Sequence, residues 1–488
     1  MSVSPSRSRS FLAVPGALLA AIGVLLIALL LAAIGVFLIA CGGGGGDETA
    51  TPVVVPPPPP PAALFPLRID AGGRHLVDAS GNPFLLHIDT GWSLIADLSK
   101  GDAEIYLENR RQKGFNAVIV NLLERQYSSN AVPNFRNAEG SPPFVPTDDY
   151  SMPNEAYFAH ADHVIKLAAS KGIVVLLAPS YLGFNGGPDG WYATMQANAP
   201  KLLDYGRYLG QRLGGNPNII WMHGGDFNPV GDKQLVRDIA LGIKEFDTQS
   251  LHTAHCAPET SALDFWAGES WLQLNNVYTY NDIPGKAQAA YASAMPFFLL
   301  ESRYENEGNP VVQTSRLRVQ AYQALLSGAM GQAFGNHPIW HFDGPGVSLY
   351  ADPVPANWEA WLDSPGALSM AHARALFVQR DWQLLVPDFA HTLLTGDLGG
   401  VEFDRAVAAR ASDGSFALAY APNTRTLTID MTGLAGPAVS ARWFDPSAGT
   451  FTPVAGSPFP NTDDSRNFPT PGNNAAGASD WVLVLESV

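Results

Sequence analysis

The stretch NEAYFAHADHVIKLAASKGIVVLLAPSY, residues 154–181, contains the repeating unit of this chain. Its first part has apolar residues at helical spacing. This part begins at Asn154, a residue type favoured at helix N-caps, and ends at Gly172, a residue type favoured just after a helix. Its second part, IVVLLAPSY, is an almost unbroken apolar run of strand length. A helix joined to a fully apolar strand is typical of a parallel sheet covered by helices.

The same alternation of helix and apolar run extends to both sides of this stretch. Further segments with helical spacing cover residues 101–114, 201–215 and 314–330. Apolar runs occupy residues 84–89, 115–123, 173–181, 218–226, 251–258, 272–280, 296–304 and 331–342. These eight runs predict an α/β fold, a (β/α)8 or TIM barrel, over residues 67–392. A doubly wound sheet is the alternative, and the lack of a Gly-rich phosphate-binding loop after the first strand disfavours it.

The sequence pattern changes on both sides of the expected barrel. Residues 393–488 contain short alternating runs separated by Gly, Asn, Asp and Pro, without a helical stretch, and this predicts a small all-β sandwich domain. Residues 41–66 contain a run of glycines followed by a run of prolines. Such segments cannot build a core, so we interpret residues 41–66 as a linker.

Residues 1–40 have the character of an export segment. Arg7 and Arg9 precede residues 11–40, which are uncharged, apolar and long enough to span a bilayer. The segment ends in Leu-Ile-Ala and Cys41, which resembles a bacterial lipobox with Cys41 as the lipidated residue. An uncleaved transmembrane helix is the alternative. Both interpretations predict a membrane-anchored protein of the cell envelope, facing the periplasm or the cell exterior.

Composition excludes several classes of protein. The chain has 488 residues, a formal net charge of -16 and no Lys/Arg cluster, so we expect no nucleic-acid partner. Two cysteines cannot form a disulfide scaffold, and we expect Cys256 to be a buried thiol. A hydrophobic content of 46% excludes disorder throughout the chain.

Acidic and aromatic residues collect at the ends of the apolar runs, where a (β/α)8 barrel carries its active site. Glycosidic cleavage needs two carboxyl groups, and aromatic rings stack on sugars, so the pattern indicates a carbohydrate site. The best catalytic pair is Asp226, which follows Gly-Gly, and Glu301, which follows PFFLL. The substrate-binding candidates are Asp89, Trp92, Glu124, Asn228, Tyr278, Glu305, Trp340 and Asp343. The first strand lacks a His-x-His motif, so we expect no catalytic metal and no cofactor.

Several blocks of the sequence carry a resemblance to a known family. They are HIDTGWSLIADLSKGDAEIYLENRRQKGFNAVIVNLL (87–123), the stretch around residues 154–178, YLGQRLGGNPNIIWMHGGD (208–226) and RALFVQRDWQLLVPD (374–388). They resemble the apiosidase-like glycoside hydrolases, glycoside hydrolase family 140 and its relatives. FALAYAP, ARWFDPSAGTFTPV and DWVLVL, between residues 416 and 485, resemble the β-domain named for collagen binding that commonly follows that barrel.

The resemblance implies a (β/α)8 barrel that hydrolyses O-glycosidic bonds in a polysaccharide, with apiose-containing pectin side chains as the substrate of characterised members. It also implies an Asp after the fourth strand and a Glu after the seventh, which match Asp226 and Glu301. Asp226 is then the general acid/base, and Glu301 is the nucleophile of a retaining mechanism or the base of an inverting one. A lipoprotein that binds a carbohydrate or a matrix protein without catalysis is the alternative function.

Overall fold

The structure is a computed structural model, and it describes residues 64–127, 135–308, 310–343, 357–462 and 465–488. The predicted export segment at residues 1–40, the lipidation site Cys41 and nearly all of the linker at residues 41–66 lie outside the described residues. In the part of the chain that the structure describes, no helix has the length and apolar character needed to cross a membrane.

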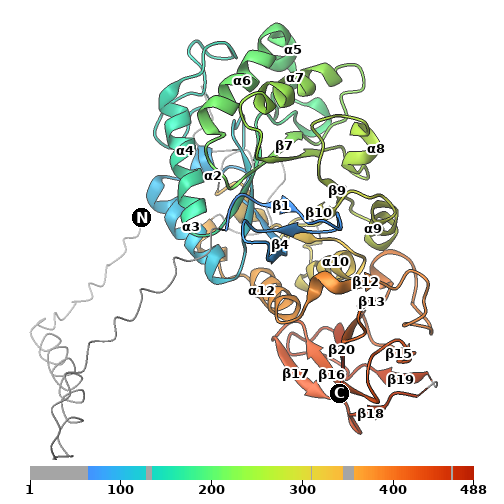
Figure 1. The fold of residues 1–488 in the computed structure, drawn as a ribbon. Coiled ribbons are helices and arrows are strands. Elements are labelled where there is room, and N and C mark those ends of the chain that lie inside the picture. Colours follow the sequence, from blue (N-terminus) through green and yellow to red (C-terminus); the bar gives the residue numbers. More distant parts are fainter. Residues whose placement is uncertain (1–63, 128–134, 309, 344–356, 463–464) are drawn as a thin grey trace, which may run out of the picture. The chain divides into compact units, whose positions relative to one another are not determined.

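Eight parallel strands form one sheet in the order β8-β7-β6-β5-β4-β11-β10-β9, which confirms the predicted barrel (Figure 1). In chain order the strands are β4 (Leu86–Thr90), β5 (Ala117–Asn121), β6 (Val174–Ala178), β7 (Ile219–Gly224), β8 (Leu251–His255), β9 (Asn275–Tyr278), β10 (Phe297–Glu301) and β11 (Gly331–Phe334). The barrel is nearly closed between β8 and β9. There the backbone N–H groups of Gln273 and Leu274 donate to the carbonyl of His252, each over 3.0 Å.

Helices surround the strands, as the alternating pattern predicts. The longer ones are α3 (Lys100–Gln112), α4 (Glu155–Ser170), α6 (Leu202–Leu213), α7 (Lys233–Lys244), α9 (Ile283–Tyr291), α10 (Thr314–Leu326) and α12 (Pro365–Val378). Short helices are α2 (Leu94–Asp97), α5 (Tyr192–Ala197), α8 (Ala262–Trp266) and α11 (His337–Trp340). Helix α4 begins where the sequence predicts, because the Asn154 side chain accepts a hydrogen bond from the Ala156 N–H.

Side chains alternate between the two faces of each barrel strand, and this alternation separates two cores. One face fills the barrel interior with Leu86, Ile88, Ala117, Ile119, Val174, Leu176, Ile220, Met222, Phe298 and Leu300. The other face packs under the helices with Val118, Val120, Val175, Leu177, Ile219, Trp221, Ala254 and Cys256. Cys256 is buried, and burial raises the pKa of its thiol to about 12, which agrees with the predicted buried thiol.

The first and last parts of the barrel differ from a plain strand–helix repeat. A three-stranded antiparallel sheet of β1 (Arg68–Ile69), β2 (Leu76–Val77) and β3 (Pro83–Phe84) precedes the barrel. In the last apolar run, residues 331–342, only the first four residues form strand β11. Asn336 is extended and Pro338 lies in the first turn of α11, so Trp340 is carried by a short helix instead of a strand.

The C-terminal domain is an antiparallel sheet with a smaller sheet packed on it. The larger sheet contains β12 (Leu385–Pro387), β13 (Val407–Ala411), β14 (Phe416–Ala421), β20 (Trp481–Ser487), β16 (Ala438–Asp445), β17 (Thr450–Pro453) and β18 (Phe459–Pro460). The smaller sheet pairs β15 (Thr426–Ile429) with β19 (Arg466–Pro469). Strand β12 already belongs to the larger sheet, so that sheet begins before residue 393.

Both faces of the larger sheet are covered. One face shares a core with β15 and β19, through residues such as Leu427, Phe468 and Leu483. The other face packs on helices α10 and α12 of the barrel, through residues such as Tyr322 and Leu418. The domain is therefore joined to the barrel by a continuous apolar core.

Candidate active site

A cavity of about 430 Å³ lies at the carboxyl ends of the barrel strands. Its walls are rich in aromatic rings and contain three carboxyl groups. It is lined by Trp92, Asn121, Tyr127, Tyr181, Phe184, Asp226, Tyr278, Tyr280, Glu301, Arg303, Tyr304, Glu307, Gly308, His337 and Trp340. The volume lies within the range of small-molecule binding sites, and the aromatic walls offer stacking faces to a sugar ring.

Asp226 reaches the cavity because the chain turns sharply after β7. Gly224 has a φ of +94°, and a side chain at Gly225 would collide with the backbone nitrogen of Leu182, at 2.6 Å. The Asp226 carboxylate accepts a hydrogen bond from the Tyr181 hydroxyl through Oδ2, over 2.8 Å. Its other oxygen, Oδ1, is buried and has no hydrogen-bond partner among the described residues. One oxygen is thus fixed by a hydrogen bond, and the other has none.

Glu301 reaches the cavity through a bulge in β10. Phe298 and Leu300 face the barrel interior, and strict alternation would turn Glu301 outward. The pairing register between β10 and β9 shifts between Leu299 and Glu301, and this irregularity re-aims the carboxylate toward the cavity. Burial and the negative charge of Asp226 raise the pKa of Glu301 to about 7, although contacts with His255 and Tyr304 oppose that rise.

His255 contacts Glu301 directly. It ends β8 on the inner face, and its Nε2 atom lies 2.8 Å from Glu301 Oε2. The imidazole stacks on the Tyr278 ring, with 5.3 Å between centroids, and meets the Trp92 ring edge-on. Burial disfavours the charged imidazolium, but Asp226 and Glu301 outweigh burial and raise the pKa of His255. His255 is not among the site residues predicted from the sequence, although the alternation of side chains from Leu251 indicates that it points inward.

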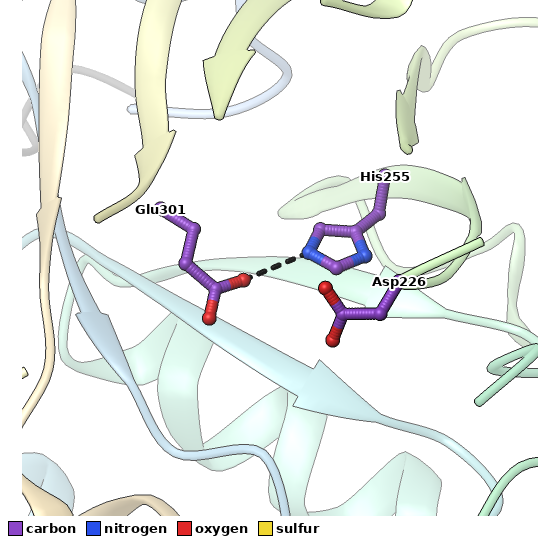
Figure 2. Close-up of side chains that lie close together, drawn as sticks. All are labelled: Asp226, His255 and Glu301. Carbon is purple, nitrogen blue, oxygen red and sulfur yellow. Dashed lines mark hydrogen bonds and ion pairs between the residues drawn. The ribbon is translucent and has the colours of Figure 1, made fainter. Parts of the chain in front are cut away.

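Asp226, His255 and Glu301 form one cluster (Figure 2). One oxygen or nitrogen atom from each residue lies within 4.8 Å of the others. The described residues contain no other group of three or more His, Cys, Asp or Glu side chains this close together. Such a distance also admits a single cation, but the His255 Nε2–Glu301 Oε2 hydrogen bond already engages two of the donor atoms. The arrangement suits the sharing of protons between two carboxyl groups and an imidazole. That the site works without a metal stays a prediction.

Hydroxyl and indole groups support this cluster. The Trp92 Nε1–H donates to the Tyr304 hydroxyl over 2.9 Å, and Tyr304 in turn contacts Glu301. The hydroxyls of Tyr278 and Tyr280 lie 2.8 Å apart. The site is therefore held by a network of hydrogen bonds from several strands, which limits the freedom of the two carboxylates.

Five of the ten predicted active-site residues line the cavity. Asp226 and Glu301 supply its central carboxylates, and Trp92, Tyr278 and Trp340 supply aromatic walls. The other five are Asp89, Glu124, Asn228, Glu305 and Asp343, and they do not line it.

Asp89 and Glu124 are buried behind the cavity wall. Asp89 is the residue after Ile88 on β4, so it faces the helices, where it accepts hydrogen bonds from Arg110 and Tyr106, each over 2.6 Å. Glu124 accepts from Ser93, from the Asn121 side chain and from the Arg125 N–H. Asp89 thus joins the barrel to α3. Glu124 does not line the cavity itself, but it holds Asn121, which does.

Asn228, Glu305 and Asp343 connect loops. Asn228 accepts from the Ala257 N–H over 3.0 Å, which joins the loops after β7 and β8. Glu305 accepts from the Gly366 N–H at the start of α12 over 2.7 Å, and from the side chains of Thr314 and Asn336. Asp343 accepts from the Asn357 and Trp358 N–H groups. These side chains satisfy backbone donors near the site and leave little capacity for a ligand.

Comparison with known proteins agrees with this geometry. A family model described as "Apiosidase-like, catalytic domain" matches residues 70–383. A second, described as "Putative collagen-binding domain of a collagenase", matches residues 386–486. A comparison with curated proteins finds no match.

Solved structures share the fold. A glycoside hydrolase family 5 protein from Bacteroides vulgatus is 23% identical, with a TM-score of 0.74 over 86% of this chain and 92% of its own. A structure described as a glycoside hydrolase is 23% identical, with a TM-score of 0.75 over 87% of this chain and 97% of its own. The family match covers most of the chain, and the cavity holds the paired carboxylates that glycoside hydrolysis requires. The chain belongs to the apiosidase-like glycoside hydrolases.

Proposed function

We propose that this glycoside hydrolase cleaves an O-glycosidic bond of a polysaccharide with retention of configuration. The observation that carries the proposal is the closeness of the two carboxyl groups, since one oxygen of Asp226 and one oxygen of Glu301 lie within 4.8 Å of each other. Retaining enzymes hold the carboxyl groups about 5–5.5 Å apart, whereas inverting enzymes leave about 6.5–9.5 Å for a water molecule. The short separation favours direct attack by one carboxylate.

In the first step Glu301 is the nucleophile and Asp226 the general acid. A Glu301 oxygen attacks the anomeric carbon and forms a covalent glycosyl ester, while the bond from that carbon to the leaving oxygen breaks. The leaving oxygen takes a proton from Asp226, whose Oδ1 has no hydrogen-bond partner among the described residues. Tyr181 holds Oδ2 and so fixes the direction of Oδ1.

In the second step water replaces the leaving group. Asp226, now a carboxylate, removes a proton from this water, and the resulting oxygen attacks the anomeric carbon. The ester bond to Glu301 breaks, the free sugar departs, and both carboxyl groups return to their starting protonation states. Trp92, Tyr278 and Trp340 provide the aromatic surfaces on which the sugar stacks.

For the substrate we propose side chains of pectin that contain apiose. The family name supports this choice, and the cavity size suits a short terminal portion of a glycan. For the location we propose export and anchoring at the cell envelope through the apolar segment 11–40 and lipidated Cys41. A Cys41→Ser variant that still carries a lipid would contradict Cys41 as the lipidated residue.

The test is a screen of the purified protein against plant and microbial polysaccharides, with the released sugars identified by mass. Proton NMR during the first turnovers then shows which anomer appears first. We expect the anomer of the substrate, and its epimer would exclude the retaining mechanism. Asp226→Ala and Glu301→Ala should each abolish release, while the exposed-acid control Glu104→Gln on α3 should keep it.

A further inference from the structure

The protonation of the two carboxyl groups presents a difficulty that the rest of the cluster must resolve. The proposed mechanism needs an ionised Glu301 and a protonated Asp226 before attack. Burial and the charge of Asp226 both favour a proton on Glu301 instead. Without a further group the shared proton would rest on the wrong carboxyl.

His255 is placed to correct this distribution. Its Nε2 lies 2.8 Å from Glu301 Oε2, and its side chain is about 1% exposed. Figure 2 shows the imidazole hydrogen-bonded to Glu301, with the Asp226 carboxylate facing the same space. The charge of an imidazolium here acts on both carboxyl groups, but only Glu301 also shares a hydrogen bond with it, and that contact adds to the stabilisation of the ionised Glu301 carboxyl.

We propose that His255 is a positioning residue which, as an imidazolium, keeps Glu301 ionised and so directs the shared proton to Asp226. This inference rests on the proposed function, because only the retaining roles require that distribution. His255 then determines which carboxyl group is the nucleophile and which is the acid. The hydrogen bond engages Glu301 Oε2 and so fixes the orientation of this carboxyl group.

The surroundings of His255 agree with a cation at this position. The titratable groups that face it are Asp226 after β7, Glu301 on β10, Tyr278 on β9 and Tyr181 after β6. Two of these are carboxyl groups, and the two tyrosines present aromatic rings. Trp92 adds a third ring, with 5.5 Å between centroids. The two carboxylates and the Tyr278 face on which the imidazole stacks favour a cation, so these neighbours support its charged form.

The direct test is a titration of the Glu301 carboxyl in the free protein by 13C NMR, with glutamate labelled at the side-chain carboxyl carbon. The Glu301 signal is identified by its loss in Glu301→Gln. His255→Gln keeps an amide donor of similar length but removes the charge. This variant therefore separates the effect of the positive charge on Glu301 from the effect of the hydrogen bond. We expect this variant to raise the pKa of Glu301 by at least about one unit, as loss of an adjacent opposite charge does. An unchanged Glu301 titration would overturn the proposal.

His252 supplies the matched control. It lies on the same strand and is equally buried, but its side chain points outward and stacks on His223. His252→Gln should leave the Glu301 titration where it is in the unchanged protein. If His252→Gln raises the pKa of Glu301 as much as His255→Gln does, the effect comes from a disturbed strand and the proposal is wrong.

A measurement on the unchanged protein covers the case in which His255→Gln does not fold. Nitrogen-15 NMR of the histidine rings distinguishes an imidazolium from a neutral ring, and we expect His255 to be an imidazolium at pH 6.5. A neutral ring at that pH would overturn the proposal. Neither titration needs a substrate. Their failure is therefore distinguishable from failure of the proposed hydrolysis, which the polysaccharide screen measures.

Discussion

The indole N–H of Trp92 donates a 2.9 Å hydrogen bond to the hydroxyl of Tyr304, so the loop after the first barrel strand is tied to the loop after the seventh. Because Tyr304 receives this hydrogen bond, its own proton is free for Glu301, which it contacts. The tyrosine hydroxyl is thus one of the groups that stabilise an ionised Glu301.

Tyr304→Phe should therefore lower kcat by about 10²-fold, the loss typical of removing one donor to a reacting group. Glu301 would lose a stabilising donor, and the acidic limb of the pH–rate profile should move to higher pH. Steady-state kinetics across pH measures both effects. The control is Tyr192→Phe, whose hydroxyl bonds Asp232 outside the cavity. An unmoved acidic limb in Tyr304→Phe would show that this hydroxyl does not act on Glu301.

The pH dependence of the reaction follows from Glu301. Attack needs its ionised form, and burial beside Asp226 raises its pKa to about 7. Below that pH the carboxyl is protonated and cannot attack, so kcat/KM should fall as the pH drops, with half of the activity lost near pH 7. A profile that stays flat down to pH 5 would contradict the role of Glu301 as nucleophile in this environment.

The same raised pKa makes a prediction about stability. The folded protein holds a proton on Glu301 more tightly than the unfolded chain does, because the pKa rises from 4.5 to about 7 on folding. The free energy of unfolding therefore falls as the pH rises through this window, and ionised Glu301 costs stability above it. Glu301→Gln should be inactive and, at pH 8, more stable by about 1–3 kcal/mol. Urea unfolding at pH 4 and pH 8 tests this, since the gain should vanish at the lower pH.

The fold could be predicted from the sequence because its determinants are local. Each of the eight apolar runs coincides with one barrel strand, with β4 ending one residue past its run, and Asn154 caps α4 as expected. The ends of parallel strands meet at one rim of the barrel, so the position of Asp226 and Glu301 along their strands was enough to bring them together.

The direction of each side chain was harder to predict. Asp89 stands at a strand end like Glu301, but alternation turns it toward the helices. Glu301 would have been turned away as well, had β10 not contained a bulge, which the run PFFLLE does not reveal. His255 follows the plain alternation of β8, yet its role depends on two carboxylates that arrive from other strands. A position at the end of a strand thus predicts that the residue lies at the rim of the barrel. The local register decides which face of the sheet its side chain occupies.

Asp89 provides a test of that distinction. It is fully buried and paired with Arg110 over 2.6 Å, so Asp89→Asn would leave a buried guanidinium without its counter-charge. We expect a loss of about 3–5 kcal/mol in the free energy of unfolding, with KM for the substrate little changed in the protein that remains folded. Chemical denaturation and steady-state kinetics give the two values. A raised KM with unchanged stability would restore Asp89 as a substrate-binding residue.

The C-terminal domain gives the last prediction, because its contact with the barrel includes a buried ion pair beside the apolar core. Arg318 on α10 donates two hydrogen bonds, of 2.8 and 2.7 Å, to Asp480, the residue before β20, and both side chains are about 1% exposed. Removal of either partner leaves an uncompensated buried charge. Asp480→Leu alone should therefore cost about 3–5 kcal/mol of unfolding free energy.

The double variant Arg318→Met/Asp480→Leu separates the ion pair from the packing around it. It should lose less stability than the sum of the two single variants, since neither buried charge then lacks a partner. The apolar core shared by α10, α12 and the sheet stays in place, so we expect barrel and β-domain to unfold in one transition. Scanning calorimetry measures this directly. Two separate transitions in the unchanged protein would show that the β-domain folds independently of the barrel.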